Sequence, residues 1–143
     1  MASIVIMEDD TLFADLVGQT LVTAGHEVTL AQTGAEALEL VKHRKIDLVI
    51  VDILIKIQGQ LVPEGGLLFL TRLRQQLPTR PFATPADIPA IAMSGAVNNP
   101  WNKDLLQTAQ SFGANEVLGK PFPPARLLEA VERLLAETSS DQR

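Results

Sequence analysis

The chain has 143 residues, of which 46% are hydrophobic, and a formal net charge of −5. This length and apolar content suit one globular domain with a packed core and argue against a disordered chain. The 12 basic residues are scattered among 17 acidic ones and cysteine is absent, so the composition gives no sign of direct nucleic-acid contact and excludes disulfides, thiol nucleophiles and thiolate metal sites.

The sequence begins MASIVIMEDD, in which an apolar run from Ser3 to Met7 is followed by Glu8, Asp9 and Asp10. The apolar run predicts a first strand. Acidic residues this close to the start leave no basic segment and no long apolar segment for export or membrane insertion. We therefore expect a cytoplasmic protein that does not bind a membrane.

A helix and a short strand are predicted next. Residues 11–24 carry apolar side chains at helical spacing, with Asp10 able to cap the first turn and Gly25 to end the helix. Glu27 to Ala31 alternates in polarity like a strand at the edge of a sheet. A second helix is predicted from Thr33 to Arg44, with Thr33 as its N-cap.

The stretch from Ile46 to Asp52, IDLVIVD, is a nearly continuous β-branched run that ends in a carboxylate. Such a run predicts a strand that is buried on both faces of a parallel sheet. In open α/β sheets, ligands bind at the carboxyl ends of the strands. Asp52 is therefore a candidate site residue, although a single acid after a strand is more often the start of a solvated loop.

The remaining apolar patterns predict helices and strands in alternation. They are a third helix at Gly66–Leu77, a fourth strand at Ile88–Met93, a fourth helix at Trp101–Phe112, a fifth strand at Glu116–Leu118 and a fifth helix at Pro124–Ala136. We expect one domain over residues 1–137 and a frayed tail over residues 138–143.

Five strands that alternate with five helices predict an α/β fold with a doubly wound parallel sheet between two helical layers, in strand order 2-1-3-4-5. This order sets the strands that end at Met7 and Asp52 side by side. The carboxylates of Glu8, Asp9 and Asp52 would then converge and repel one another, which favours a bound cation. Hard oxygen ligands suit Mg²⁺ better than metals that prefer imidazole or thiolate.

Two connections are longer than compact domains usually need. Residues 53–65 follow Asp52 at the edge of the sheet where the acids lie, and residues 78–87, with three prolines, are predicted at the opposite edge. Both segments are interpreted as loops.

Two further polar residues follow predicted strands. Ser94 follows IPAIAM, and Lys120 follows EVLG and precedes Pro121. Each alone is most simply a turn or surface residue. Combined with a carboxylate nucleophile and a metal held by acids, a hydroxyl and an ammonium suit phosphoryl transfer.

Four segments, IVIMEDD, DLVIVD, AIAMSG and LGKPF, occur in the order and at the strand positions typical of one family. In these segments the chain resembles a CheY-like response-regulator receiver domain of two-component signalling, with a flavodoxin-like fold, over nearly its full length. The resemblance implies that Asp52 is the phospho-acceptor, that Ser94 bonds the phosphoryl group and that Lys120 pairs with it. It also implies a cis Lys120-Pro121 bond.

The resemblance further implies a Mg²⁺ cofactor held by Glu8, Asp9 and Asp52, with the backbone carbonyl of Leu54 as an additional ligand. The implied phosphodonor is a histidine kinase or a phosphotransfer protein, and the signal passes to a downstream target protein. Such a domain is no enzyme in the ordinary sense, because it catalyses only its own phosphorylation and dephosphorylation. We expect a monomer or weak dimer.

The sequence departs from the family pattern at two places. Pro63 to Gly66, PEGG, arrives about six residues late, which indicates an insertion after Asp52, and Val117 replaces the aromatic residue three positions before the lysine. Two alternative functions stay open: a pseudo-receiver that only binds partners, and a phosphatase with an Asp nucleophile. The phosphatase would need a D-x-D pair after the first strand and a cap domain. The segment EDDT lacks the first Asp of that pair, and no cap fits in 143 residues.

Overall fold

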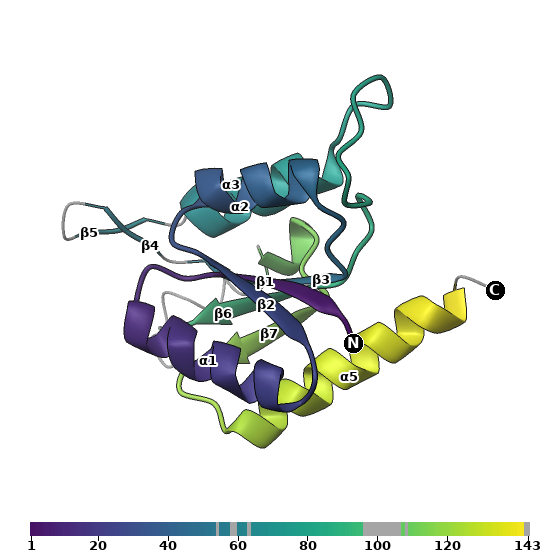
Figure 1. Ribbon diagram of the computed structural model, residues 1–143. Helices are drawn as coiled ribbons and strands as arrows, with labels where there is room; N and C mark the ends of the chain where they lie inside the picture. Colours follow the sequence, from purple (N-terminus) through teal and green to yellow (C-terminus); the bar gives the residue numbers. More distant parts are fainter. Residues whose placement is uncertain (54, 58–59, 63, 96–106, 108, 142–143) are drawn as a thin grey trace.

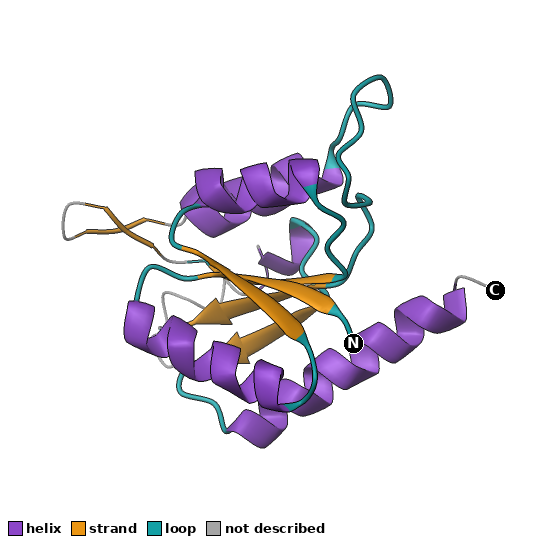
Figure 2. Cartoon of the chain, viewed as in Figure 1, coloured by secondary structure: helices purple, strands orange, loops and turns teal. Residues whose placement is uncertain are grey.

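A five-stranded parallel sheet forms the centre of the molecule (Figure 1). The structure is a computed structural model that describes residues 1–141 except 54, 58–59, 63, 96–106 and 108. Helices cover both faces of the sheet, with α1 and α5 on one side and α2 and α3 on the other (Figure 2). This arrangement confirms the predicted three-layer α/β fold.

The strand order of the sheet is β2-β1-β3-β6-β7, and every neighbouring pair is parallel. The predicted order 2-1-3-4-5 is therefore confirmed. The strands of this sheet span Ser3–Met7 (β1), Glu27–Ala31 (β2), Leu48–Asp52 (β3), Ala90–Ser94 (β6) and Glu116–Gly119 (β7).

The helices lie where the 3.6-residue patterns predict them. They span Thr11–Thr23 (α1), Gly34–His43 (α2), Glu64–Arg74 (α3) and Pro124–Asp141 (α5). Most of the predicted helix at Trp101–Phe112 lies outside the described residues. Within this range, Gln107 and residues 109–111 are described and are helical.

The core lies in two layers, one on each face of the sheet. Every residue of β3 and β6 is buried, because these central strands are covered by helices on both sides. Successive residues point to opposite faces: Val49 and Val51 pack in the layer with α2 and α3, whereas Leu48 and Ile50 pack in the layer with α1 and α5.

The predicted caps of the first two helices are present. The side chain of Asp10 accepts a hydrogen bond from the backbone N–H of Phe13 at 3.2 Å, and Gly25 follows the C-cap of α1 with φ +96°. Thr33 Oγ1 accepts from the N–H of Glu36 at 3.1 Å. These local contacts fix where α1 and α2 begin, directly after the carboxyl ends of β1 and β2.

The segment after Asp52 is a hairpin, so its interpretation as a loop was wrong for the described residues. β4 (Ile55–Ile57) pairs antiparallel with β5 (Gln60–Val62), with Ile55 opposite Val62. The segments IKI and QLV are rich in residues with high β propensity, and two such runs close in sequence pair readily. The hairpin projects from the body of the molecule at the side of α3 (Figure 1).

The C-terminal helix is longer than predicted. α5 continues five residues beyond Ala136, so the tail predicted to be frayed is helical as far as Asp141. The sequence ETSSD contains no glycine or proline that would end a helix. In this added part, Thr138 Oγ1 donates to the carbonyl oxygen of Leu134 at 3.0 Å.

The other long connection, between α3 and β6, lies at the amino edge of the sheet as expected and rises beyond the ends of α2 and α3 (Figure 1). Its anchor is Thr84, which is fully buried. The hydroxyl of Thr84 donates to the carbonyl oxygen of Arg44 at 2.6 Å and accepts from the N–H of Ile46 at 2.9 Å. These bonds attach the segment to the turn between α2 and β3.

The first turn of α3 lies directly against the end of β3. A Cβ atom added at Gly66 would lie 2.4 Å from the carbonyl oxygen of Asp52 and 2.9 Å from the Cα of Ile53. Real Cβ atoms do not approach backbone this closely, so only glycine fits. The first turn of α3 thus brings the chain back to Asp52 after the hairpin.

We predict that Gly66→Ala destabilises the protein by about 1–3 kcal/mol, because the backbone of β3 or α3 must shift. Gly18→Ala is the matched control. Gly18 is also helical, its added Cβ would have no neighbour closer than 3.6 Å, and alanine favours the helix by about 0.5–1 kcal/mol. Urea unfolding measures both free energies. Equal stability of the parent and Gly66→Ala would contradict the close approach.

Candidate functional site

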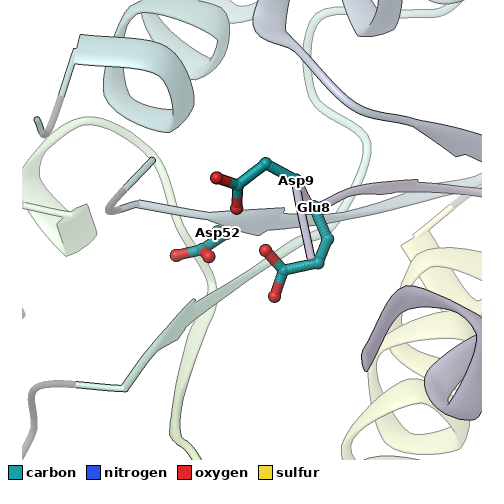
Figure 3. Close-up of side chains that lie close together, drawn as sticks. All are labelled: Glu8, Asp9 and Asp52. Carbon is teal, nitrogen blue, oxygen red and sulfur yellow. The ribbon is translucent and has the colours of Figure 1, made fainter. Parts of the chain in front are cut away.

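Three carboxylates meet at the carboxyl edge of the sheet. Glu8 and Asp9 directly follow β1, and Asp52 is the last residue of β3, the neighbouring strand. One carboxylate oxygen of each residue lies within 4.8 Å of the others, and Figure 3 shows the three side chains directed toward a common point. The convergence follows from the strand order, because Met7 pairs with Val51.

The site is only partly open to solvent. Glu8 is 1% exposed and Asp52 is 4% exposed, whereas Asp9 is partly exposed. A buried carboxylate is costly unless another charge or hydrogen bonds compensate for lost hydration. The burial therefore requires a cationic partner close by.

Lys120 supplies that charge from the end of β7, two strands away from β3 in the sheet. Its ammonium donates hydrogen bonds to Glu8 Oε1 and to Asp52 Oδ2, the latter at 2.9 Å. The side chain follows β7, which ends at Gly119. The Lys120-Pro121 peptide bond is cis, as the resemblance implied.

Burial and the repulsion between carboxylates shift the pKa values of Glu8 and Lys120. Burial raises the pKa of Glu8 to about 8, and the neighbouring Asp52 carboxylate acts in the same direction, against the smaller opposite effect of Lys120. Burial alone would lower the pKa of Lys120, but its hydrogen bond to Glu8 and the charge of Asp52 outweigh that effect and raise it. The edge therefore holds a charged ammonium beside a carboxyl group that binds a proton easily.

Ser94 ends β6 at the same edge and is fully buried. β6 lies between β3 and β7, with Met93 opposite Asp52 and Ser94 opposite Gly119. The backbone oxygen of Ser94 also accepts from the N–H of Lys120 at 2.8 Å. The sheet thus places the hydroxyl residue between the strands that carry the carboxylate and the ammonium.

Leu54, the predicted backbone ligand, lies outside the described residues. Val117 lies in β7 and is partly buried against the core. Its aliphatic side chain cannot perform the ring rotation that an aromatic residue at this position would allow.

An aromatic pair beside Lys120 was not predicted as part of the site. The ammonium of Lys120 lies 4.5 Å from the centroid of the Phe13 ring, within the range of a cation–π interaction. Phe13 in turn meets Phe122 edge to face, with centroids 5.7 Å apart and planes at 82°. Sequence alone gave only a weak signal, namely one aromatic residue in the first turn after Asp10 and another after the Lys-Pro pair.

The chemistry of this donor set is specific. Three carboxylates offer oxygen ligands only, and Mg²⁺ favours a few such ligands together with water. The residues present therefore fit a magnesium ion. The ammonium and hydroxyl at the adjoining strand ends are donors suited to an incoming phosphoryl group.

In the part of the chain that the structure describes, no helix combines the length and the apolar character needed to span a bilayer.

Known proteins resemble this chain over nearly all of its length. Among curated proteins, the probable transcriptional regulator ycf29 of Porphyra purpurea is 27% identical over 137 residues, covering 96% of this chain and 58% of that protein. The response regulator MprA of Mycobacterium sp. (strain KMS) is 28% identical over 140 residues, covering 97% and 53%. The chain thus spans about half the length of these curated relatives.

A solved structure shares the whole fold. The CheY-like response regulator receiver domain protein from Methanospirillum hungatei JF-1 superimposes with a TM-score of 0.77 and 25% identity, covering 99% of this chain and 98% of that one. In addition, the family model described as the response regulator receiver domain matches residues 4–132. On this match and this fold, the chain belongs to the response regulator receiver domain family, the signalling modules of two-component systems.

Proposed function

We propose that this domain is a phospho-accepting receiver in which Asp52 takes a phosphoryl group from a phosphohistidine. The observation that carries the proposal is the position of Asp52. Its carboxylate ends a buried central strand, with two further carboxylates on one side and the ammonium of Lys120 at 2.9 Å. The donor of the group would be a histidine kinase or a phosphotransfer protein.

In the proposed reaction, a carboxylate oxygen of Asp52 attacks the phosphorus atom. A P–O bond to Asp52 forms while the P–N bond to the histidine breaks, and the imidazole keeps the electron pair and takes up a proton. The nucleophile and the phosphoryl group are both anionic, so the step needs positive charge between them. Glu8, Asp9 and Asp52 would hold Mg²⁺, with the backbone carbonyl of Leu54 as an additional ligand, and the ion supplies that charge when bound.

Lys120 and Ser94 act after the transfer in this proposal. Before it, the ammonium is shared between Glu8 and Asp52. A phosphoryl group on Asp52 adds charge and acceptor oxygens, so the ammonium and the Ser94 hydroxyl gain new partners. Because Ser94 ends β6 and Lys120 directly follows β7, their movement would bias the loops that follow.

The proposed output is a change in protein contacts. Receiver domains act as signalling modules, and we infer that this one catalyses no reaction besides its own phosphorylation and dephosphorylation. It would work in the cytoplasm as a monomer or weak dimer, signalling to a downstream target protein without contacting nucleic acid itself. Retention of all three acids and the lysine argues against a pseudo-receiver, which would need none of them.

We predict that incubation with acetyl phosphate and Mg²⁺ adds one phosphoryl group to the protein, and that Asp52→Asn abolishes it, because an amide is not a competent nucleophile here. Intact-mass spectrometry and peptide mapping measure the product. Asp15→Asn, at an exposed position on α1, is the matched control and should be modified like the parent. Labelling of Asp52→Asn, or mapping of the group to Asp9, would overturn the assignment.

We also predict that Mg²⁺ binds more tightly as the pH rises from about 6 to 8. The raised pKa of Glu8, about 8, means that the folded protein holds a proton there which the cation must displace. Displacement of one proton strengthens the affinity by up to about tenfold per pH unit below that pKa, and the effect levels off above it.

Calorimetric titration in buffers of different ionisation enthalpy measures both the dissociation constant and the protons released. Glu8→Gln should bind Mg²⁺ weakly, with little change over the same pH range. An affinity of the parent that stays constant between pH 6 and 8 would show that Glu8 does not exchange a proton for the ion.

A further inference from the structure

A second recessed surface lies far from the acidic edge, at the opposite end of α2 and α3. It is a groove of about 530 Å³ between the last turns of these helices, closed on one side by the segment that follows α3. In Figure 1 this is the region where the teal segment rises beyond the ends of α2 and α3. The groove is lined by Leu38, Lys42, His43, Thr71, Arg72, Gln75, Gln76, Leu77, Arg80, Pro81 and Phe82.

The wall formed by this segment is held in place by hydrogen bonds. The side-chain amide of Gln76 donates to the carbonyl oxygen of Thr84 at 2.9 Å and accepts from the N–H of Phe82 at 2.8 Å. The N–H of Thr84 donates to the carbonyl oxygen of Val41 in α2 at 3.0 Å. The groove is therefore built into the fold, which lowers the entropy cost of binding a ligand there.

The groove combines an apolar floor with an exposed apolar rim. Leu38 is buried and Phe82 packs partly against the same core layer. Leu77 is 63% exposed, so most of its side chain adds no buried apolar surface to the fold. A ligand with an apolar side chain could cover Leu77, and the removal of its surface from water would favour binding.

The charged groups that line the groove are all basic. They are Lys42, Arg72 and Arg80, and the imidazole of His43 lies beside them as a hydrogen-bonding group. This is unexpected on a chain with a net charge of −5. Glu39, which lies outside the lining, pairs with Lys42 at 3.7 Å and His43 at 3.1 Å.

The two arginines have no such carboxylate partner in the described part of the chain. Among the described residues, no carboxylate lies within 4.0 Å of the guanidinium of Arg72 or Arg80. Basic residues in the last turn of a helix stabilise its dipole, which accounts for Arg72 in α3. Arg80 lies outside any helix, so this explanation does not extend to it.

We propose that the groove binds an acidic peptide segment of a protein partner, with an apolar side chain of the segment seated between Leu77 and Phe82. Guanidinium groups form paired hydrogen bonds with carboxylates, and Arg72 and Arg80 line the groove from two different elements, α3 and the segment that follows it. Their charge complements aspartate and glutamate. This interaction goes beyond the phosphoryl transfer proposed above and does not depend on Asp52.

The test uses the unphosphorylated full chain and a fluorescein-labelled peptide that alternates glutamate with leucine, with binding measured by fluorescence anisotropy. A second peptide has lysine in place of glutamate, and a third has serine in place of leucine. We expect the parent to bind the first peptide at least about tenfold more tightly than either other peptide, since both charge and apolar contact contribute.

Variants locate the binding surface. Arg80→Glu and Leu77→Ser should each weaken binding of the first peptide by about tenfold or more. Lys45→Glu makes the same type of charge reversal at an exposed residue outside the groove, and Leu16→Ser truncates a leucine of matching exposure, 64%, on α1. Both controls should bind like the parent. Arg72→Glu serves as a second charge variant if Arg80→Glu is not folded by circular dichroism.

Equal binding of the glutamate and lysine peptides would overturn the proposal. So would equal affinity of Arg80→Glu and Lys45→Glu for the first peptide, because the basic residues of the groove would then serve only the helix ends and solubility. Either result leaves the phosphorylation of Asp52 unaffected, so the two proposals are tested separately.

Discussion

The parallel pairing of β1 with β3 is the constraint on which the site depends. It forces Glu8, Asp9 and Asp52 to the same edge, where like charges repel and burial removes water from them. One ammonium, that of Lys120, offsets part of this cost by bonding to two of the three carboxylates. The negative charge that remains makes the edge suitable for a divalent cation. The repulsion between the carboxylates thus both destabilises the cluster and favours the cation that its proposed function needs.

Much of this arrangement could be predicted from the sequence because it depends on short-range patterns. The apolar run before Asp52 indicates a strand buried on both faces, and β3 is buried at every position. Asp10 and Thr33 are N-caps of α1 and α2. Each was predictable because a residue with a capping side chain stands just before apolar residues at helical spacing. Once the strand order is fixed by the rules for parallel sheets, the meeting of the three acids follows without further information.

Some features were not predicted because they arise from contacts between residues that are distant in the sequence. Others were not predicted because no local sequence pattern marks where an element begins or ends. The contact of Phe13 with Lys120 joins residues 107 positions apart, and no local pattern encodes it. The basic groove requires α2, α3 and the following segment to be placed together. The hairpin and the additional turns of α5 were missed because short β-prone runs and polar helical ends are ambiguous in sequence.

The segment that carries the hairpin is fixed on both sides of it, at Ile53 and at Gly66, beside the end of β3. The N–H of Ile53 is bonded to the carbonyl oxygen of Met93 at 3.1 Å, and Gly66 rests on the carbonyl group of Asp52. Because both ends are fixed beside the end of β3, the number of residues between them can change without moving the residues at the edge of the sheet. Closing a longer loop costs little additional entropy. The segment between Ile53 and Gly66 can therefore accept insertions of different length, so a new recognition element can be placed there within a few residues of the proposed acceptor, Asp52.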